Sequence, residues 1–297
     1  MTTIASNGTG RDEAIAPDRW ILLDYSGTLS LEAPLFGQPD RLLEELKRSG
    51  LYRRGVDSLD IFWNRIVNPT WTKGSTTAAG YRNVIEEAVR TMDEESPSEG
   101  GEASLSFAVS SFAQTYFEHS SIDGRWQSHL QRWSRTPEAA LAVVTDHYAE
   151  ATPSIIGHLG KLGIEACPAG DATADSLSAG TVVVANSADL GVHKDRPLYW
   201  QKLGQRTGLN TARRIVLVDD FGANEQGADA YGASSQVEAR RRTYREMLQG
   251  LFPAAIDIIP FIVEGMDRLP PEAYHRLFGQ RISEAARAVD RFLSLRD

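Results

Sequence analysis

The stretch WILLDYSGTL, residues 20–29, decides the fold. Four apolar residues are followed at once by Asp24 and then by a polar turn that contains Gly27. A short apolar run that ends in polar and glycine residues is typical of a buried parallel strand meeting its loop. The stretch therefore predicts one strand of a parallel sheet, with Asp24 at the carboxyl end of that strand.

Three further apolar runs have the same form. They are LAVV at residues 141–144, TVVV at 181–184 and RIVLV at 214–218. Each precedes a segment with a helical pattern, at residues 154–162, 197–207 and 224–231. Strands that alternate with helices predict an α/β chain with a Rossmann-like parallel sheet. Ligands of such sheets bind outside the carboxyl ends of the strands, so the residues that follow these runs are the candidates for a site.

A long segment, residues 24–140, separates the first two runs, and this is far more than a crossover loop needs. Helical patterns fill it at residues 40–48, 59–67, 81–92, 105–117 and 126–133. We expect a helical cap domain at 31–136, inserted into a core domain made of 19–30 and 137–297. Residues 1–18 are expected to form a disordered tail, and 93–102 an acidic solvated loop. Residues 68–77, NPTWTKGSTT, are expected to form a loop between helices, either structural or closing over the substrate.

Composition excludes several classes of protein. The 297 residues carry a net charge of −9, with 41% hydrophobic and 24% charged residues, which indicates a globular chain without the basic footprint of a nucleic-acid binder. The single cysteine, Cys167, excludes an intrachain disulfide and a cysteine metal cage. No long apolar run and no signal-peptide pattern are present, so we expect a cytoplasmic protein with no membrane partner. The oligomeric state, monomer or homodimer, stays open.

The polar residues after the apolar runs resemble the motifs of the haloacid dehalogenase superfamily, in their order and spacing. The four motifs are DYSGTL at 24–29, Thr145 after the second run, Lys194 in GVHKDRPLYWQKL at 191–203, and the acidic VLVDDFGANEQGADAYG at 216–232. The resemblance covers residues 20–232, with the cap matched only by position and helicity. It implies a HAD-like core with an inserted cap and a hydrolase that acts on a small anionic, phosphorylated substrate.

The resemblance also implies a role for each motif residue. Asp24 would be the nucleophile that forms an aspartyl-phosphate, Thr145 would bind a phosphate oxygen, and Lys194 would neutralise developing charge and hold Asp24 ionised. Substrate contacts are expected from the Ser26, Gly27 and Thr28 loop and from Lys73 in the cap. Mg²⁺ is the expected cofactor, and its expected ligands are Asp24, the Ser26 carbonyl, Asp219 and Asp220.

Ser26 departs from the superfamily's phosphatase pattern, in which an aspartate at this position protonates the leaving group. A serine cannot do so near neutral pH. Three functions therefore stay open: a Mg²⁺-dependent phosphohydrolase with its acid/base elsewhere, a phosphonoacetaldehyde-type C–P bond hydrolase that uses a cap lysine, with Lys73 as the candidate, or a ligand-binding pseudoenzyme. Asp146 is expected to cap the following helix, and Asn224 to orient the acidic loop or a metal-bound water.

Overall fold

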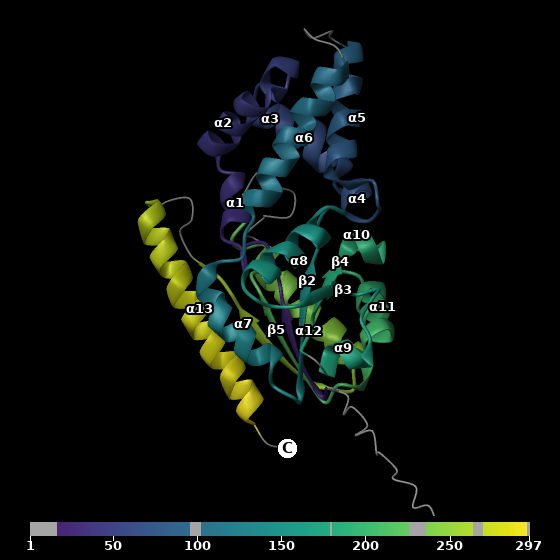
Figure 1. The fold of residues 1–297 in the computed structure, drawn as a ribbon, viewed down its shortest axis with the longest axis vertical. Coiled ribbons are helices and arrows are strands. Elements are labelled where there is room, and N and C mark those ends of the chain that lie inside the picture. The colour runs from purple at the N-terminus through teal and green to yellow at the C-terminus, as the bar shows by residue number, and fades with distance from the viewer. Residues whose placement is uncertain (1–16, 96–101, 179, 226–235, 264–269, 296–297) are drawn as a thin grey trace, which may run out of the picture.

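A six-stranded parallel sheet forms the centre of the computed structural model, which describes residues 17–95, 102–178, 180–225, 236–263 and 270–295. The strands are β1 (Arg19–Leu23), β2 (Ala139–Thr145), β3 (Ala166–Pro168), β4 (Val182–Asn186), β5 (Arg214–Asp219) and β6 (Ala255–Pro260). They lie side by side in the order β3-β4-β2-β1-β5-β6 (Figure 1). The expected α/β fold with a Rossmann-like parallel sheet is confirmed. The short edge strand β3 was not predicted, because three residues give no periodicity to detect.

The register of the sheet brings the strand ends together. Leu23 of β1 pairs with Val143 of β2 on one side and with Val218 of β5 on the other. The next residue, Asp24, donates its backbone N–H to the Val218 carbonyl at 2.9 Å. Asp24 therefore leaves the sheet at the same edge as Thr145, the last residue of β2.

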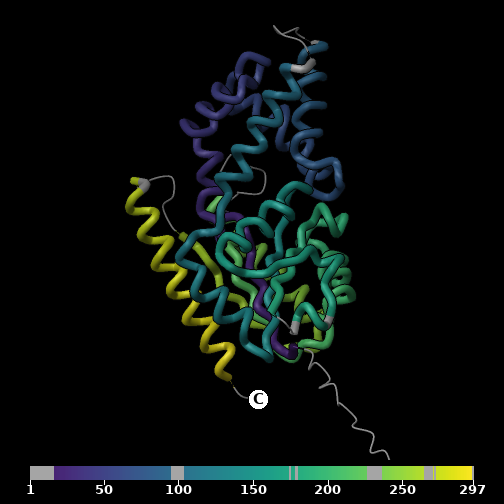
Figure 2. Tube along the Cα trace, in the orientation of Figure 1, coloured from purple at the N-terminus to yellow at the C-terminus, as the bar shows by residue number. Residues whose placement is uncertain are grey.

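Helices cover both faces of the sheet, because successive strand residues point to opposite sides. One face packs against α7 (Gln127–Ser134), α8 (Ala151–Lys161) and α13 (Pro271–Ser294), and the other against α11 (Pro197–Thr207) and α12 (Val237–Leu251). The long α13 runs beside α7, as Figure 2 shows, and an ion pair between Arg132 and Asp290 at 2.7 Å joins the two helices. Three short helices complete the core: α9 (Ala174–Ser178), α10 (Ser187–Leu190) and η4 (Leu209–Thr211).

The segment between β1 and β2 is helical, and most of it lies beyond one end of the sheet in Figure 1. Its elements are α1 (Glu32–Phe36), α2 (Pro39–Ser49), η1 (Leu51–Arg54), α3 (Leu59–Ile61), η2 (Phe62–Val67), α4 (Asn68–Ser75), α5 (Gly80–Glu95), α6 (Glu102–His119), η3 (Gly124–Trp126) and α7. The last of these, α7, packs on the sheet. The division into a cap at 31–136 and a core at 19–30 and 137–297 stays a prediction.

The expectation of a loop at residues 68–77 is wrong for most of its length, because α4 occupies Asn68–Ser75. Hydroxyl side chains explain the difference. Thr70 and Ser75 donate to the carbonyls of Ile66 and Trp71, four residues earlier, at 2.6 and 2.5 Å. A Ser/Thr-rich run reads as a loop because its hydroxyls compete for backbone groups, but here these hydroxyls bond within the helix.

Some expectations fall on residues that the structure does not describe. They include most of the tail at 1–18, much of the acidic loop at 93–102, and all but the first two residues of the helix at 224–231. Within the described residues, no helix has both the length and the apolar character that a membrane crossing requires.

Candidate active site

A buried ion triad lies where β1, β5 and the loop after β4 meet. The Lys194 ammonium lies 2.5 Å from Asp24 Oδ1 and 2.9 Å from Asp219 Oδ2, and all three side chains are almost completely buried. Buried charges are tolerated only when they are paired and hydrogen-bonded. One ammonium between two carboxylates leaves the group net negative, so this edge of the sheet attracts a cation.

A third carboxylate, Asp220, completes an acidic cluster. One ligand atom each from Asp24, Asp219 and Asp220 can be chosen so that all lie within 4.8 Å of one another. Asp220 Oδ1 accepts from the Gly222 N–H at 2.8 Å and its Oδ2 from the Asn224 N–H at 2.9 Å. Each oxygen keeps a second lone pair, so these bonds orient Asp220 without using up its capacity as a metal ligand.

The loop after Asp220 is strained. Phe221 has φ of 54°, and it is the one residue other than glycine with positive φ in the described part of the chain. A bulky residue in this region costs free energy and is common at functional sites. The Phe221 N–H donates to Asp219 Oδ1 at 2.6 Å, and its buried ring packs 5.7 Å from that of Tyr244. Packing and hydrogen bonding therefore hold the two acidic residues in place.

Gly27 is required by this close packing. Its φ is +71°, and a Cβ at this position would collide with Asp220 Oδ2 and would lie 3.0 Å from Asn224 Cβ. Any larger residue would push the loop after β1 away from the acidic loop after β5. Gly27 and the buried Thr28 thus shape the site, whereas Ser26 lines the adjoining cavity.

Asn224 joins three segments of chain. Its side-chain N–H₂ group donates to the Gly27 carbonyl at 2.7 Å and to the Phe261 carbonyl at 2.8 Å, and its Oδ1 accepts from the Val263 N–H at 2.8 Å. These three bonds use both N–H bonds of the Asn224 amide and one lone pair of its oxygen, so the side chain has a structural role. Of the two roles expected for Asn224, the structure gives it the orientation of the loop. The segment after β6 takes part in holding the site, which the sequence did not indicate.

A cavity of about 90 Å³ lies over the triad. Its floor consists of polar residues from the strand ends: Asp24, Ser26, Thr145, Asp146, His147, Lys194 and Glu225. Its roof consists of apolar and aromatic residues, mostly from the helices between β1 and β2: Ala33, Pro34, Phe36, Gly37, Leu42, Phe62, Trp63, Val67, Trp71, Tyr81, Tyr116 and Tyr148. Within these described residues, Lys194 is the only lysine or arginine.

Burial perturbs the carboxyl groups of the floor. It raises the pKa of Asp24 to about 7, although the charge of Lys194 opposes the rise. Burial and the neighbouring charge of Asp24 raise the pKa of Asp220 well above its usual value. Without further positive charge, this cluster cannot hold all its carboxylates ionised at neutral pH. Oxygen donors with this unmet negative charge fit Mg²⁺, a hard cation.

Asp146 lines the cavity, and the expectation that it caps the following helix is wrong, because α8 begins at Ala151 with Glu150 as its N-cap. It follows Thr145 directly, is half-buried, and its Oδ1 accepts from the Lys194 N–H at 2.8 Å. Burial raises its pKa to about 7 against the lowering effect of Lys194. Ser26 lines the same cavity as Asp146. A carboxyl group is therefore present in the cavity although position 26 carries a serine in place of the aspartate of the superfamily pattern.

His147 stays neutral at physiological pH, because burial lowers its pKa to about 4. Its Nδ1 accepts from the Tyr148 N–H at 2.9 Å, which leaves the proton of the neutral ring on Nε2. That atom lies 2.9 Å from the hydroxyl of Tyr116 on α6. His147 therefore ties the loop after β2 to the helical segment.

The structure does not bring Lys73 to this cavity. Lys73 lies on the exposed side of α4, where its ammonium pairs with Glu87 of α5. By contrast, Trp71 on the same helix lines the cavity and stacks on His193, with ring centres 6.1 Å apart. The predicted cluster of Asp24, Thr145, Lys194, Asp219 and Asp220 thus gathers at one edge of the sheet, and Lys73 lies apart from it.

Comparisons with known proteins identify similar folds. No protein-family model and no curated protein matches the chain. A 2-haloacid dehalogenase from Pseudomonas syringae pv. Tomato DC3000 is similar over 74% of this chain and 83% of its own, with 17% identity and a TM-score of 0.45. The HAD-hydrolase YfnB from Bacillus subtilis, solved bound to magnesium, is similar over 88% of this chain and 99% of its own, with 14% identity and a TM-score of 0.41.

At such low identities and TM-scores these likenesses concern the fold alone, and no residue's role rests on them. The first of these proteins is named a 2-haloacid dehalogenase and the second a HAD-hydrolase, and the four motifs of this chain resemble the same superfamily.

Proposed function

We propose that the protein is a Mg²⁺-dependent phosphohydrolase that hydrolyses a small phosphate monoester through an aspartyl-phosphate at Asp24. One observation carries the proposal: the Lys194 ammonium lies between the Asp24 and Asp219 carboxylates, beside Asp220, on the floor of a cavity. A carboxylate oriented by an ammonium in a cation-attracting pocket suits nucleophilic attack on an anionic phosphoryl group.

In the first step, a carboxylate oxygen of Asp24 forms a bond to phosphorus while the bond from phosphorus to the leaving oxygen breaks. That oxygen takes a proton and leaves as an alcohol. In the second step, water attacks phosphorus, the bond to Asp24 breaks, and a proton of the water passes to a base. Asp24 and Asp220 would hold Mg²⁺, together with Asp219 directly or through a water molecule. The bound ion would offset the negative charge of the phosphoryl oxygens.

We propose Asp146 as the acid and base in these steps. Ser26 has no group that exchanges protons near neutral pH, whereas the Asp146 carboxyl lines the cavity with its pKa raised to about 7 by burial. A group with a pKa near the working pH is suited both to give a proton to the leaving oxygen and to accept one from water. Lys194 holds Asp146 through its backbone N–H and Asp24 through its ammonium, so one residue orients both groups.

The alternative function, a C–P bond hydrolase that uses a cap lysine, has less support than the phosphohydrolase. Schiff-base chemistry needs a lysine with its amine in the cavity, and Lys194 is the one lysine among the described lining residues. Its ammonium is occupied by two carboxylates, and Lys73 pairs with Glu87 outside. The acidic cluster suits a phosphohydrolase better than a metal-free dehalogenase.

Trapping the intermediate tests the proposal. The protein is mixed with Mg²⁺ and a panel of phosphate monoesters, quenched in acid, digested and analysed by mass spectrometry. We expect a phosphoryl group on the peptide that contains Asp24 and none in Asp24→Asn. Asp146→Asn should both form and lose this adduct more slowly, because the first step lacks its acid and the second its base.

Steady turnover by Asp24→Asn would contradict the nucleophilic role. A panel without any Mg²⁺-dependent turnover, in which a phosphonate still raises the melting temperature, would instead identify a ligand-binding pseudoenzyme.

A further inference from the structure

We infer that the leaving group of the substrate is an apolar body without a second anionic group, aryl or branched alkyl, which lies against the helices between β1 and β2. This inference names the substrate class of the active site, and it rests on the proposed phosphohydrolase function. Its basis is the contrast between the polar floor and the apolar roof of one cavity.

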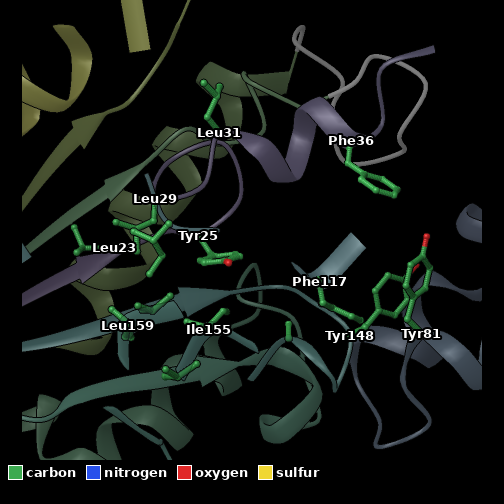
Figure 3. Close-up of a cluster of buried hydrophobic side chains, with 14 of the residues drawn as sticks. Leu23, Tyr25, Leu29, Leu31, Phe36, Tyr81, Phe117, Tyr148, Ile155 and Leu159 are labelled. Carbon is green, nitrogen blue, oxygen red and sulfur yellow. The ribbon is translucent and has the colours of Figure 1, made fainter. Parts of the chain in front are cut away.

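The roof presents aromatic rings and aliphatic side chains to a ligand bound above Asp24. Phe36 comes from α1, Trp71 from α4, Tyr81 from α5 and Tyr148 from the loop after β2. Figure 3 shows the stacked pair of Tyr81 and Tyr148, whose ring centres are 4.1 Å apart, on one side and Phe36 on the other. Surfaces of this kind stabilise a bound apolar group by about 25 cal/mol for each Å² removed from water.

An unusual helical turn places further apolar groups in the roof. η2 (Phe62–Val67) is a π-helix, a rare conformation that occurs often at functional sites. The hydrogen bonds of a π-helix join residues five apart, so Phe62 and Val67 lie on one face. Both line the cavity, and Trp63 beside them lines it too. The costly turn therefore directs three apolar side chains to one wall.

Charge and hydrogen bonding disfavour other substrate classes. A second anionic group would meet no cation of the roof, because Lys194 is the only lysine or arginine among the described lining residues. It would also face the carboxyls of Asp146 and Glu225. A polyol would place several hydroxyls against a roof that is mostly rings and hydrocarbon, with tyrosine hydroxyls and indole N–H groups as its polar atoms. Each buried hydroxyl left unpaired there costs about 1–3 kcal/mol.

Contacts between roof and core hold the roof over this body. The Glu150 carboxylate accepts from the first N–H groups of α5, at Tyr81 and Arg82, at 2.7 and 3.1 Å. On the other side, Ser187 Oγ donates to the Ser75 carbonyl at 2.6 Å. These bonds join α4 and α5 to the loops that carry the floor residues. The roof is therefore held over the floor, and the leaving group lies between them.

The test compares alcohols of similar leaving ability. Benzyl phosphate and isopentyl phosphate are compared with glycerol phosphate, glucose 6-phosphate, choline phosphate and a sugar bisphosphate, each with Mg²⁺. We expect kcat/KM for the two apolar esters to exceed that for each of the others by about tenfold or more. Trp63→Ala should lower kcat/KM for benzyl phosphate about tenfold and that for glycerol phosphate less than about twofold. Phe107→Ala, at an exposed aromatic residue of α6, is the matched control and should change neither.

Equal or higher kcat/KM for glucose 6-phosphate, choline phosphate or the bisphosphate would overturn the inference and leave the proposed function standing. If no ester is hydrolysed, the proposed function fails, and binding decides the inference. Benzylphosphonate should then raise the melting temperature more than methylphosphonate does in the presence of Mg²⁺, and Trp63→Ala should remove the difference. Equal shifts in the wild-type protein would overturn the inference.

Discussion

The floor and the roof of the cavity are built in opposite ways. The floor carries buried charges, Asp24, Lys194 and Asp219, at the ends of strands whose backbone the sheet holds in register. The roof carries rings such as Trp63 and Trp71 on short helices that connect to the core by a few hydrogen bonds. Buried charged side chains are stable only with partners at fixed distances, whereas the stability of an apolar contact depends on the surface area that it removes from water. In the proposed function, the floor therefore supplies the reacting groups and the roof selects the substrate.

The largest expected effect comes from removing the cation of the floor. Lys194→Met should lower kcat about 10³-fold, because the ammonium orients Asp24 and offsets charge in the transition state. The matched control, Lys202→Met, loses a lysine of α11 that donates to the Leu190 carbonyl, and its kcat should stay within about twofold. Stopped-flow phosphate release measures both.

Lys194→Met also leaves buried carboxylates unpaired, so its fold is checked by circular dichroism at acidic pH, where these groups are protonated. A folded Lys194→Met with undiminished kcat would remove the charged floor from the mechanism.

Replacing the proposed acid and base should have the next largest effect. Asp146→Asn should lower kcat about 10²-fold while the protein still binds Mg²⁺. In the wild-type protein, the pH profile should show a group that titrates near pH 7, and Asp146→Asn should lose that limb of the profile. Asp171→Asn, at an exposed residue that follows β3, is the control. An unchanged pH profile in Asp146→Asn would show that another group transfers the proton.

A smaller effect is expected from restoring the carboxyl at position 26. Asp146 and Ser26 line the same cavity, so Ser26→Asp should replace part of the function of Asp146. In the Asp146→Asn background, Ser26→Asp should raise kcat about tenfold, and in the wild-type background it should change kcat less than about threefold. A double-mutant cycle of kcat values measures this coupling, and simple additivity would contradict it.

The smallest expected effect is on stability. Burial raises the pKa of Asp24 from its usual 3.8 to about 7, so the fold favours the protonated carboxyl. The stability that this gives is complete below about pH 4 and is lost as the pH rises through 7. The metal-free protein should therefore melt at a lower temperature at pH 8 than at pH 5. Mg²⁺ should raise the melting temperature by several degrees at pH 8 and by less at pH 5.

Asp220→Asn should remove most of the response to Mg²⁺, because it lacks one carboxylate of the cluster. Sodium chloride at matched ionic strength is the control for screening. A melting temperature that rises with pH in the metal-free protein would show that the cluster is not desolvated.

The strands and most of the helices were predictable, because their patterns are local. The segment at Pro197–Thr207 is one helix, as its sequence predicts. The α4 segment was not, since its hydroxyls suit a loop and a helix alike and packing against the core decides between them. The π-helix of η2 leaves no mark in the periodicity either.

The sequence by itself determined the parallel sheet and the types of residue at its carboxyl edge, because apolar runs and the polar residues after them are adjacent in the chain. Only the tertiary structure decided which side chains share the cavity. It placed Asp146 beside Lys194, set Lys73 outside, and joined Asn224 to the segment after β6. Such pairs are distant in sequence, and the direction of a side chain depends on packing that no local pattern records.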